Sequence, residues 1–491
     1  MSVAISRLSF EHHRTALGIS ETEPRISWRF GGNAIDWEQT TYDIEIERLG
    51  RGDESLSGDY ESYSVNSSDS LVVPWPSDPL ESADRANVRV RAHGQTGQSS
   101  TPWSDWVSVE TGLLDEGDWA GAVTVAADRD TEVDSAHQPV YFRKPFDIEA
   151  DEIARARLYI TSLGIYEAEI NGKRVGDHVL APGWQSYNYR HVYDTYDVTN
   201  LLNGGEENAI GVIVGEGWWS GRLSFGGGTP NNYGDTIGLH CLLRVTTKDG
   251  DEIDIPSDTT WQSSLGPLLA SEIYDGEIYD SRLDMAVKGF SSAGFDDSDW
   301  IGTKELPPIE GSLVAPDGPP VRRVEERRPE TIFQSPTNKT LIDFGQNLVG
   351  WIRINGVEGP EGTNITLQHA EVLDDNGELA TEPLRVAKAR DIFILNGAGE
   401  QMYEPRFTFH GFRYAQIDGW PAETPLTPES LTAVVVHSDM EQTGYFECSN
   451  PLLNKFHENV RWSMKGNFLS IPTDCPQVCL LSPRFSRARL T

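Results

Sequence analysis

The stretch PLLNKFHENVRWSMKGNFLSIPTDCPQ, residues 451–477, begins with apolar residues at every fourth position. This spacing places side chains on one face of an α-helix. Asn450 is a good N-cap in front of the stretch, and Pro451 suits the first helical position. The sequence therefore predicts an amphipathic helix with a single apolar stripe, formed by Leu452, Phe456, Val460, Met464 and Phe468.

The motif IPTDCPQ, residues 471–477, follows this helix, and the character of the sequence changes after it. Residues 478–491 contain no Asp or Glu, although the chain has 76 acidic residues in all. The same segment carries Arg484, Arg487 and Arg489. We interpret it as an aberrant tail that arises from a frame or intron error, with a genuine alternative C-terminus as the other reading.

Upstream of the helix the pattern is that of β-strands. Tyr42, Ile44 and Ile46 alternate with acidic residues, as in a half-buried strand, and residues 88–93 alternate in the same way. Clusters of Pro, Gly, Ser and Asp separate such runs. Residues 1–115 are therefore predicted to form a fibronectin-type or immunoglobulin-like β-sandwich.

Two further β units follow. Asn171-Gly172 is a typical hairpin turn, and the apolar run at 209–214 indicates a strand buried on both faces. A proline-rich linker near residue 320 precedes another strand pattern that includes 392–395. The prediction is a mainly β fold, with tandem β-sandwich domains at 1–115, 116–320 and 321–432, and then a helical segment at 433–477.

The run GEGWWSGR, residues 215–222, contains the candidate sugar-binding residues. Exposed aromatic rings stack on the apolar faces of pyranoses, whose hydroxyl groups need polar partners. Trp218 and Trp219 are candidates for stacking, and Arg222 and Asn188 are candidates for hydrogen bonding. The alternative is that both tryptophans cap the core of the sandwich, and residue types alone leave both readings open.

Several phrases resemble α-L-rhamnosidases of glycoside hydrolase family 78. They are IPTDCPQ, GEGWWSGR, INGKRVGDHVLAPGWQSYNYRHVYDTYDVT at 170–199, DFGQNLVGWIRING at 343–356 and YEPRFTFHGFRYAQIDGWP at 403–421. The resemblance covers residues 14–477, about half of a family member. It implies that residues 433–477 begin the (α/α)6 catalytic barrel, which is incomplete here.

The resemblance also implies the chemistry. Family members remove terminal α-L-rhamnose by inversion, with a general acid and a general base about 6.5–9.5 Å apart. In the family both carboxylates come from the barrel after the IPTDCPQ motif, so we assign no catalytic residue and expect this chain to be inactive. His369 with Glu371, and His410 with Arg413, are the nearest polar pairs, and we expect them to be structural.

The resemblance further implies calcium as a candidate cofactor, because some members bind L-rhamnose with this ion. Asn231, Asn232 and Asp235 offer suitable hard oxygen ligands. The alternative is that they are ordinary turn residues. The expected partner is an L-rhamnose-containing glycoside or polysaccharide, and the alternative function is a non-catalytic carbohydrate-binding array.

The net charge of −36 argues against nucleic acid or an anionic membrane as a partner. No apolar run is long enough to span a bilayer, and the N-terminus lacks the apolar core of a signal peptide. We therefore expect a cytoplasmic location. Four cysteines in 491 residues are too few for a disulfide framework.

Overall fold

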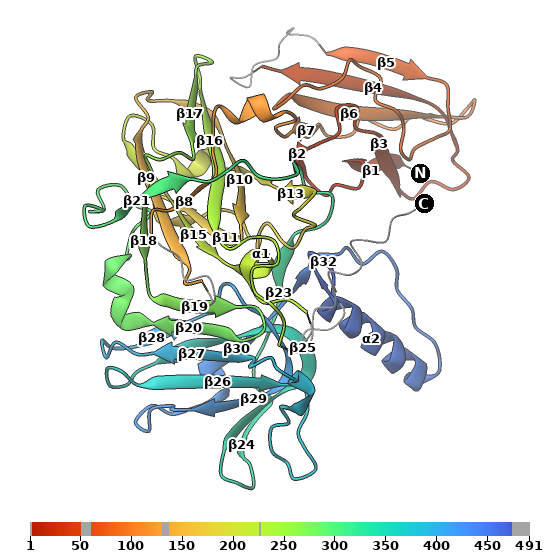
Figure 1. Ribbon diagram of the computed structural model, residues 1–491. Coiled ribbons are helices and arrows are strands. Elements are labelled where there is room, and N and C mark those ends of the chain that lie inside the picture. Colours follow the sequence, from red (N-terminus) through yellow and green to blue (C-terminus); the bar gives the residue numbers. More distant parts are fainter. Residues whose placement is uncertain (1, 51–59, 130–136, 225–226, 474–491) are drawn as a thin grey trace, which may run out of the picture.

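A computed structural model describes residues 2–50, 60–129, 137–224 and 227–473 of the chain. Within these ranges the protein is mainly β, as predicted, with three sheet-based domains and one long helix (Figure 1). The second domain lies between the first and the third. Residues 474–477 of the IPTDCPQ motif and the tail at 478–491 lie outside the described residues.

The first domain packs a small sheet, β1–β3, against a larger one of order β2–β7–β6–β4–β5. The predicted alternation is confirmed, because Tyr42, Ile44 and Ile46 pair with the alternating residues of the neighbouring strand and are buried. The strands are β1 (Val3–Phe10), β2 (Ala16–Ile19), β3 (Ile26–Gly32), β4 (Gln39–Leu49), β5 (Glu61–Val65), β6 (Arg85–Gly94) and β7 (Val107–Thr111).

The second domain is built on a sheet of order β12–β11–β15–β9–β18–β21–β8–β16–β10–β14, with β17 beside β16. Asn171 and Gly172 both have positive φ in the turn between β11 and β12, as the hairpin prediction requires. All of residues 209–214 are buried, which confirms the two-sided burial of that run. The strands are β8 (Val125–Ala127), β9 (Val140–Asp147), β10 (Ile153–Leu163), β11 (Ile165–Ile170), β12 (Lys173–Arg174), β13 (Arg190–Val192), β14 (Asp194–Asp197), β15 (Glu207–Gly215), β16 (Gly238–Thr247), β17 (Glu252–Pro256), β18 (Gln262–Leu265), β21 (Ile301–Glu305) and β22 (Ser312–Val314).

The third domain is built on a sheet of order β19–β20–β27–β26–β29–β25–β30–β23, with β24 and β28 also beside β25. Its strands are β19 (Leu268–Glu272), β20 (Gly276–Asp280), β23 (Val321–Arg327), β24 (Thr331–Gln334), β25 (Thr340–Val357), β26 (Asn364–Ala370), β27 (Arg390–Ile394), β28 (Gln401–Tyr403), β29 (His410–Asp418) and β30 (Leu431–Ser438). The short 3-10 turns of the chain are η1 (Glu116–Trp119), η2 (Thr199–Leu201), η3 (Ser281–Ala286), η4 (Glu382–Leu384) and η5 (Pro428–Ser430).

The sheets divide the chain differently from the predicted boundaries at 320 and 432. The hairpin β19–β20 belongs by sequence to the second domain, but β20 pairs in parallel with β27 of the third. Strand β30 continues to Ser438, six residues past the predicted boundary. Alternation within a strand shows which face is buried, but not which sheet the strand joins.

The predicted helix is present as α2 (Pro451–Gly466), and the Asn450 side chain accepts a hydrogen bond from the backbone N–H of Leu452. Its inner side meets the third domain, where Trp462 packs against the core and Gly466 lies close to Val349. The outer side carries the predicted stripe, whose exposed fractions are 78% for Leu452, 65% for Phe456, 48% for Val460 and 47% for Met464. Phe468 lies beyond the helix in β31 (Phe468–Leu469), which pairs with β32 (Ile471–Pro472).

No helix within the described ranges is both long and apolar enough to cross a membrane.

Candidate functional site

The run GEGWWSGR folds as a tight turn around α1 (Gly217–Ser220) at the end of β15. Trp218 points into the core with 1% of its surface exposed, and its ring lies 6.1 Å from the Trp184 ring with the planes 5° apart. The prediction of an exposed, sugar-stacking ring is wrong for Trp218. Gly217 has φ of 48°, and a Cβ at this position would lie 2.7 Å from the Ile165 side chain, so the turn requires glycine here.

Trp219 remains half-buried at the edge of this core. Its indole N–H donates to the carbonyl of Thr236 at 3.0 Å. Its ring stacks beside Tyr233 at 6.4 Å, with 16° between the planes, and Tyr187 meets both rings edge-on. At this turn the structure therefore leaves a partly exposed aromatic pair, Trp219 and Tyr233, of which the sequence analysis identified only the first.

Arg222 and Asn188 do not lie together. The Arg222 guanidinium donates to Asp275 Oδ1 at 2.6 Å and to the carbonyl of Gly227 at 2.9 Å, and it lies over the ring of Tyr274. It thus joins the second domain to the β19–β20 turn. Asn188 is exposed between β12 and β13, and it is its neighbour Tyr187 that contacts Trp219.

The three residues predicted as calcium ligands contact other protein groups in the structure. Asn231 Oδ1 lies 3.2 Å from His137 Nε2, and the Asn232 amide donates to the carbonyl of Thr229. Exposed Asp235 accepts from Thr236 Oγ1 at 3.1 Å. Calcium takes six to eight oxygen ligands, and these three side chains, already engaged with other protein groups, do not fit such a set.

The sequence analysis did not identify a group of buried carboxyls that lies next to this turn. Glu216 is 1% exposed; its Oε2 accepts the backbone N–H of His137 at 2.9 Å, and its Oε1 has no partner among the described residues. Burial raises the pKa of Glu216 to about 8, with the His137 bond opposing the rise and the charges of Glu272 and Asp275 adding to it. Burial also raises the pKa of Glu272 to about 7, although Arg222 opposes it. A glutamate between two glycines, directly after the apolar run at 209–214, was the available signal in the sequence.

The polar residues that the sequence analysis paired in the third domain have other partners in the structure. His369 does not meet Glu371; its Nδ1 donates to the carbonyl of Ala389 at 2.9 Å, and its ring stacks on His410 at 4.2 Å. His410 Nε2 lies 3.1 Å from Asp391, and all three of these side chains are buried.

The other two members of those pairs lie apart from this cluster. Arg413 forms a two-pronged ion pair with Asp343 at 2.8 Å, and Glu371 accepts from the Asn347 amide at 2.9 Å. These groups hold strands of the third sheet together.

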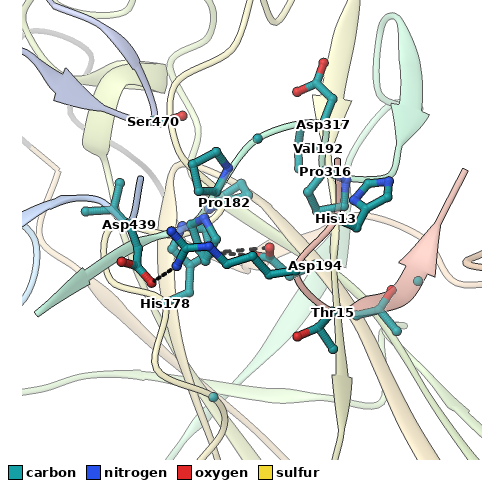
Figure 2. A pocket seen from close by; sticks show the side chains of 18 of the residues that line it. His13, Thr15, His178, Pro182, Val192, Asp194, Pro316, Asp317, Asp439 and Ser470 are labelled. Atoms are coloured by element: carbon teal, nitrogen blue, oxygen red, sulfur yellow. Dashed lines mark hydrogen bonds and ion pairs between the residues drawn. The ribbon is translucent and has the colours of Figure 1, made fainter. Parts of the chain in front are cut away.

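A crevice of about 700 Å³ opens where the three domains meet. Figure 2 shows its side chains, which come from the first domain, the second domain, the 316–322 linker and the segments near 440 and 470. Asp439 Oδ2 accepts from Arg14 Nη1 at 2.7 Å and from Arg322 Nη1 at 2.9 Å. One carboxylate thus ties the first domain and the start of β23 to the segment that leads into α2.

Asp194 is the buried carboxylate of the crevice wall. It lies 3.2 Å from His178 Nδ1 and accepts from the Tyr166 hydroxyl at 2.6 Å. Burial alone would raise its pKa, but His178 and the hydroxyls of Tyr166 and Tyr196 hold the pKa below its usual value. The wall therefore presents an ionised carboxylate whose own bonds hold it in place.

Four family models match consecutive parts of the chain. They describe a Rha78A-like N-terminal immunoglobulin domain (5–115), an α-L-rhamnosidase N-terminal domain (151–325), a bacterial α-L-rhamnosidase concanavalin-like domain (333–437) and a bacterial α-L-rhamnosidase six-hairpin glycosidase domain (441–479). The order matches the order of the three β domains and α2 observed in the structure.

Individual relatives agree with this match. An α-L-rhamnosidase of Formosa agariphila is 32% identical over 488 residues, which covers 94% of this chain and 50% of the relative. The crystal structure of an Aspergillus terreus α-L-rhamnosidase superposes with a TM-score of 0.92 at 59% identity, over 97% of this chain and 54% of that one. A Streptomyces avermitilis α-L-rhamnosidase, solved in complex with L-rhamnose, gives a TM-score of 0.85 at 27% identity, over 97% and 61%.

Tandem β domains followed by a segment that a six-hairpin domain model matches have the domain order of a multidomain glycoside hydrolase family. The chain belongs to the α-L-rhamnosidase family, glycoside hydrolase family 78. It spans about half the length of the curated relatives it matches.

Proposed function

We propose that this chain is the β-domain scaffold of an α-L-rhamnosidase, the whole of which removes terminal α-L-rhamnose from glycosides by inversion. On its own, the chain does not hydrolyse rhamnosides. The observation that carries this proposal is the outer face of α2, whose apolar side chains are 47–78% exposed. That helix lies in the part matched by the six-hairpin domain, and an apolar stripe of this kind is built to be covered by further helices.

The chemistry supports an inactive scaffold. An inverting hydrolysis needs a proton donor and a base on opposite sides of the scissile bond, with a water molecule between base and sugar. Glu216 has the raised pKa of a proton donor, but with 1% of its surface exposed it cannot reach a glycosidic oxygen. Its raised pKa is therefore a consequence of its position in the core.

The test is hydrolysis of an aryl α-L-rhamnoside by the purified 491-residue chain. The expected result is no turnover above the rate of buffer alone, because loss of a general acid alone costs about 10²–10⁴ in rate. Glu216→Gln and Glu371→Gln serve as matched variants. Turnover that disappears in either variant would contradict the proposal and place the chemistry in a β domain.

A second candidate function, sugar binding without catalysis, is favoured by the half-buried pair Trp219 and Tyr233. Rings stacked in this way at a surface can hold the apolar face of a sugar. Titration with L-rhamnose, followed by tryptophan fluorescence, tests it. A response in the parent chain that is lost in Trp219→Ala supports this candidate, and the absence of any response leaves the scaffold role alone.

A further inference from the structure

The crevice at the junction of the three domains has the size and position of a ligand site. Its volume of about 700 Å³ lies within the roughly 300–1,000 Å³ that is typical of small-molecule sites. Such sites occur preferentially at interfaces between domains. No sequence motif drew attention to it, because its walls come from segments that are more than 400 residues apart along the chain.

The charge of the crevice selects against an anionic ligand. Its carboxylates outnumber its guanidinium groups two to one: Asp177, Asp194, Asp197, Asp317, Asp439 and Glu441 against Arg14, Arg190 and Arg322. An anion that entered would meet net repulsion at distances where charges in a partly enclosed site interact strongly.

The charge of the crevice does not favour a cationic ligand either, because its carboxylates are paired with groups of the protein. Asp439 accepts from two guanidinium groups, as described above. Arg190 pairs with Asp317 at 2.9 Å, and Arg322 also pairs with Asp177 at 2.9 Å. These pairs occupy the carboxylates concerned, so the wall stays acidic on balance but offers hydrogen-bonding groups that are already held by partners.

Among the residues that the structure describes, the pairs leave hydrogen-bonding capacity unused. Arg14 carries five N–H donors, of which the bond to Asp439 uses one, and its side chain is 37% exposed. The side chain of Arg190 is 35% exposed, and its Nη1 likewise donates to one carboxylate. Both groups are already held in position, so a ligand would gain hydrogen bonds without the cost of ordering them.

The remaining wall is apolar. It includes Leu17, Pro182, Val192, Pro316, Pro320 and Ile471. A ligand that fits such a crevice has hydroxyl groups on one side and an apolar face on the other, and it carries no formal charge. A neutral saccharide has these properties, and a 6-deoxyhexose adds a methyl group that an apolar wall accommodates well.

We propose that this crevice binds a neutral, rhamnose-containing saccharide, as a site for a part of the glycoside remote from the bond that is cleaved. This inference rests on the proposed function for its choice of sugar. It differs from the second candidate function in its position, because Trp219 and Tyr233 do not line the crevice.

The experiment measures binding of methyl α-L-rhamnoside and of a neutral rhamnose-containing disaccharide to the 491-residue chain, by saturation-transfer NMR and calorimetry. D-glucuronate serves as the anionic comparison. Binding of both rhamnosides and none of glucuronate is expected. Because the readout is binding, failure of this inference is separate from the result of the hydrolysis assay.

Two variants test the location. Arg14→Met removes donors but leaves Asp439 its bond to Arg322, and it should weaken binding about threefold to tenfold, as loss of one or two hydrogen bonds does. Gly318→Trp adds an indole at the crevice, where a side chain meets no neighbour within 4 Å, and it should abolish binding. Gly302→Trp, at an equally open position on β21 outside the crevice, is the matched control and should bind as the parent does.

Three outcomes would overturn the inference. They are absence of rhamnoside binding in the parent chain, binding that survives both Arg14→Met and Gly318→Trp, and binding that Trp219→Ala removes while Gly318→Trp does not. Equal binding of glucuronate would refute the choice of a neutral ligand.

Discussion

The indole rings of Trp184 and Trp218 lie almost parallel, 5° apart with centroids 6.1 Å from each other, and both are at most 2% exposed. The pair forms part of a cluster that joins the second domain to the third, since Phe409 also contacts the Trp218 ring at 6.3 Å. One of the two tryptophans predicted to stack on a sugar is therefore part of the core between two domains.

Replacing Trp218 by Ala should destabilise the protein strongly. Loss of a fully buried Trp costs about 3–5 kcal/mol, because a cavity remains where the ring packed. Trp219→Ala, which removes a half-buried ring, should cost clearly less. Urea denaturation followed by circular dichroism measures both, and equal losses in the two variants would contradict the placement of Trp218 in the core.

Stability should depend on pH through Glu216. Its pKa is raised on folding to about 8, so between about pH 5 and pH 8 the folded chain binds more protons than the unfolded chain. The free energy of unfolding should therefore fall as pH rises through this window, by at most about 1.4 kcal/mol per pH unit for one group. Glu216→Gln should flatten the fall and stabilise the protein at pH 8.

The control for this experiment is Glu149→Gln, which changes an exposed carboxyl of the second domain. It should leave the pH dependence as in the parent chain. The measurement is the denaturant midpoint of each variant at pH 5, 6, 7 and 8. The same pH dependence in Glu216→Gln as in the parent chain would refute the role of Glu216.

The outer face of α2 should make the isolated chain associate. Leu452 and Phe456 are one helical turn apart and 78% and 65% exposed, and contact between two such faces would remove apolar surface from water. Light scattering after size exclusion should show a mass that rises with concentration. The double variant Leu452→Glu/Phe456→Glu should be monomeric, whereas Asn459→Glu, on the same helix, should behave as the parent chain does.

Limited proteolysis provides an independent check on α2. The helix should be cut early in dilute samples, where no partner covers it. A monomeric parent chain whose α2 resists protease would contradict the exposed placement of the stripe.

The ion pair between Arg406 and Glu167 should matter for the contact between the second and third domains. Arg406 Nη1 donates to Glu167 Oε2 at 2.5 Å, and the carboxylate, which is 3% exposed, also pairs with Arg174 at 2.9 Å. Burial alone would raise the pKa of Glu167, but Arg406 and Arg174 hold it below its usual value.

Arg406→Met should therefore cost about 1–3 kcal/mol, because it leaves a buried carboxylate with one partner fewer. Glu167→Gln added to Arg406→Met should recover part of that loss, since the unpaired charge is then gone. Thermal unfolding of the two single variants and the double variant forms a cycle, and strictly additive losses would contradict direct coupling.

The sequence predicted the parts of the fold that depend on local periodicity. The alternation at Tyr42, Ile44 and Ile46, the turn at Asn171-Gly172 and the helix after Asn450 are all present, because each is determined by neighbouring residues. Burial of Trp218 depends on Trp184, which lies 34 positions earlier, and no local pattern encodes that contact.

The candidate sites were harder to predict for the same reason. Arg222 pairs with Asp275, and Asn231 lies beside His137. Both residues thus contact groups that are distant in the sequence, and local patterns do not reveal such contacts. The crevice was not predicted at all, since residues near 14, 190, 320 and 440 meet only when the domains are assembled. Motif composition does not show which groups are exposed, because tertiary contacts decide this, as the burial of Trp218 illustrates.

The placement of β19–β20 has a consequence for how the molecule can be divided. The chain runs from β18 in the second sheet to β19 and β20 in the third, returns to β21 in the second, and enters the third again at β23. Because the chain crosses three times between the two sheets, no single break in the chain would give two fragments that each contain one complete sheet. The two domains are interlocked by topology, so they should unfold together, and a fragment that ends at residue 320 would carry a hairpin whose partner strand β27 is missing.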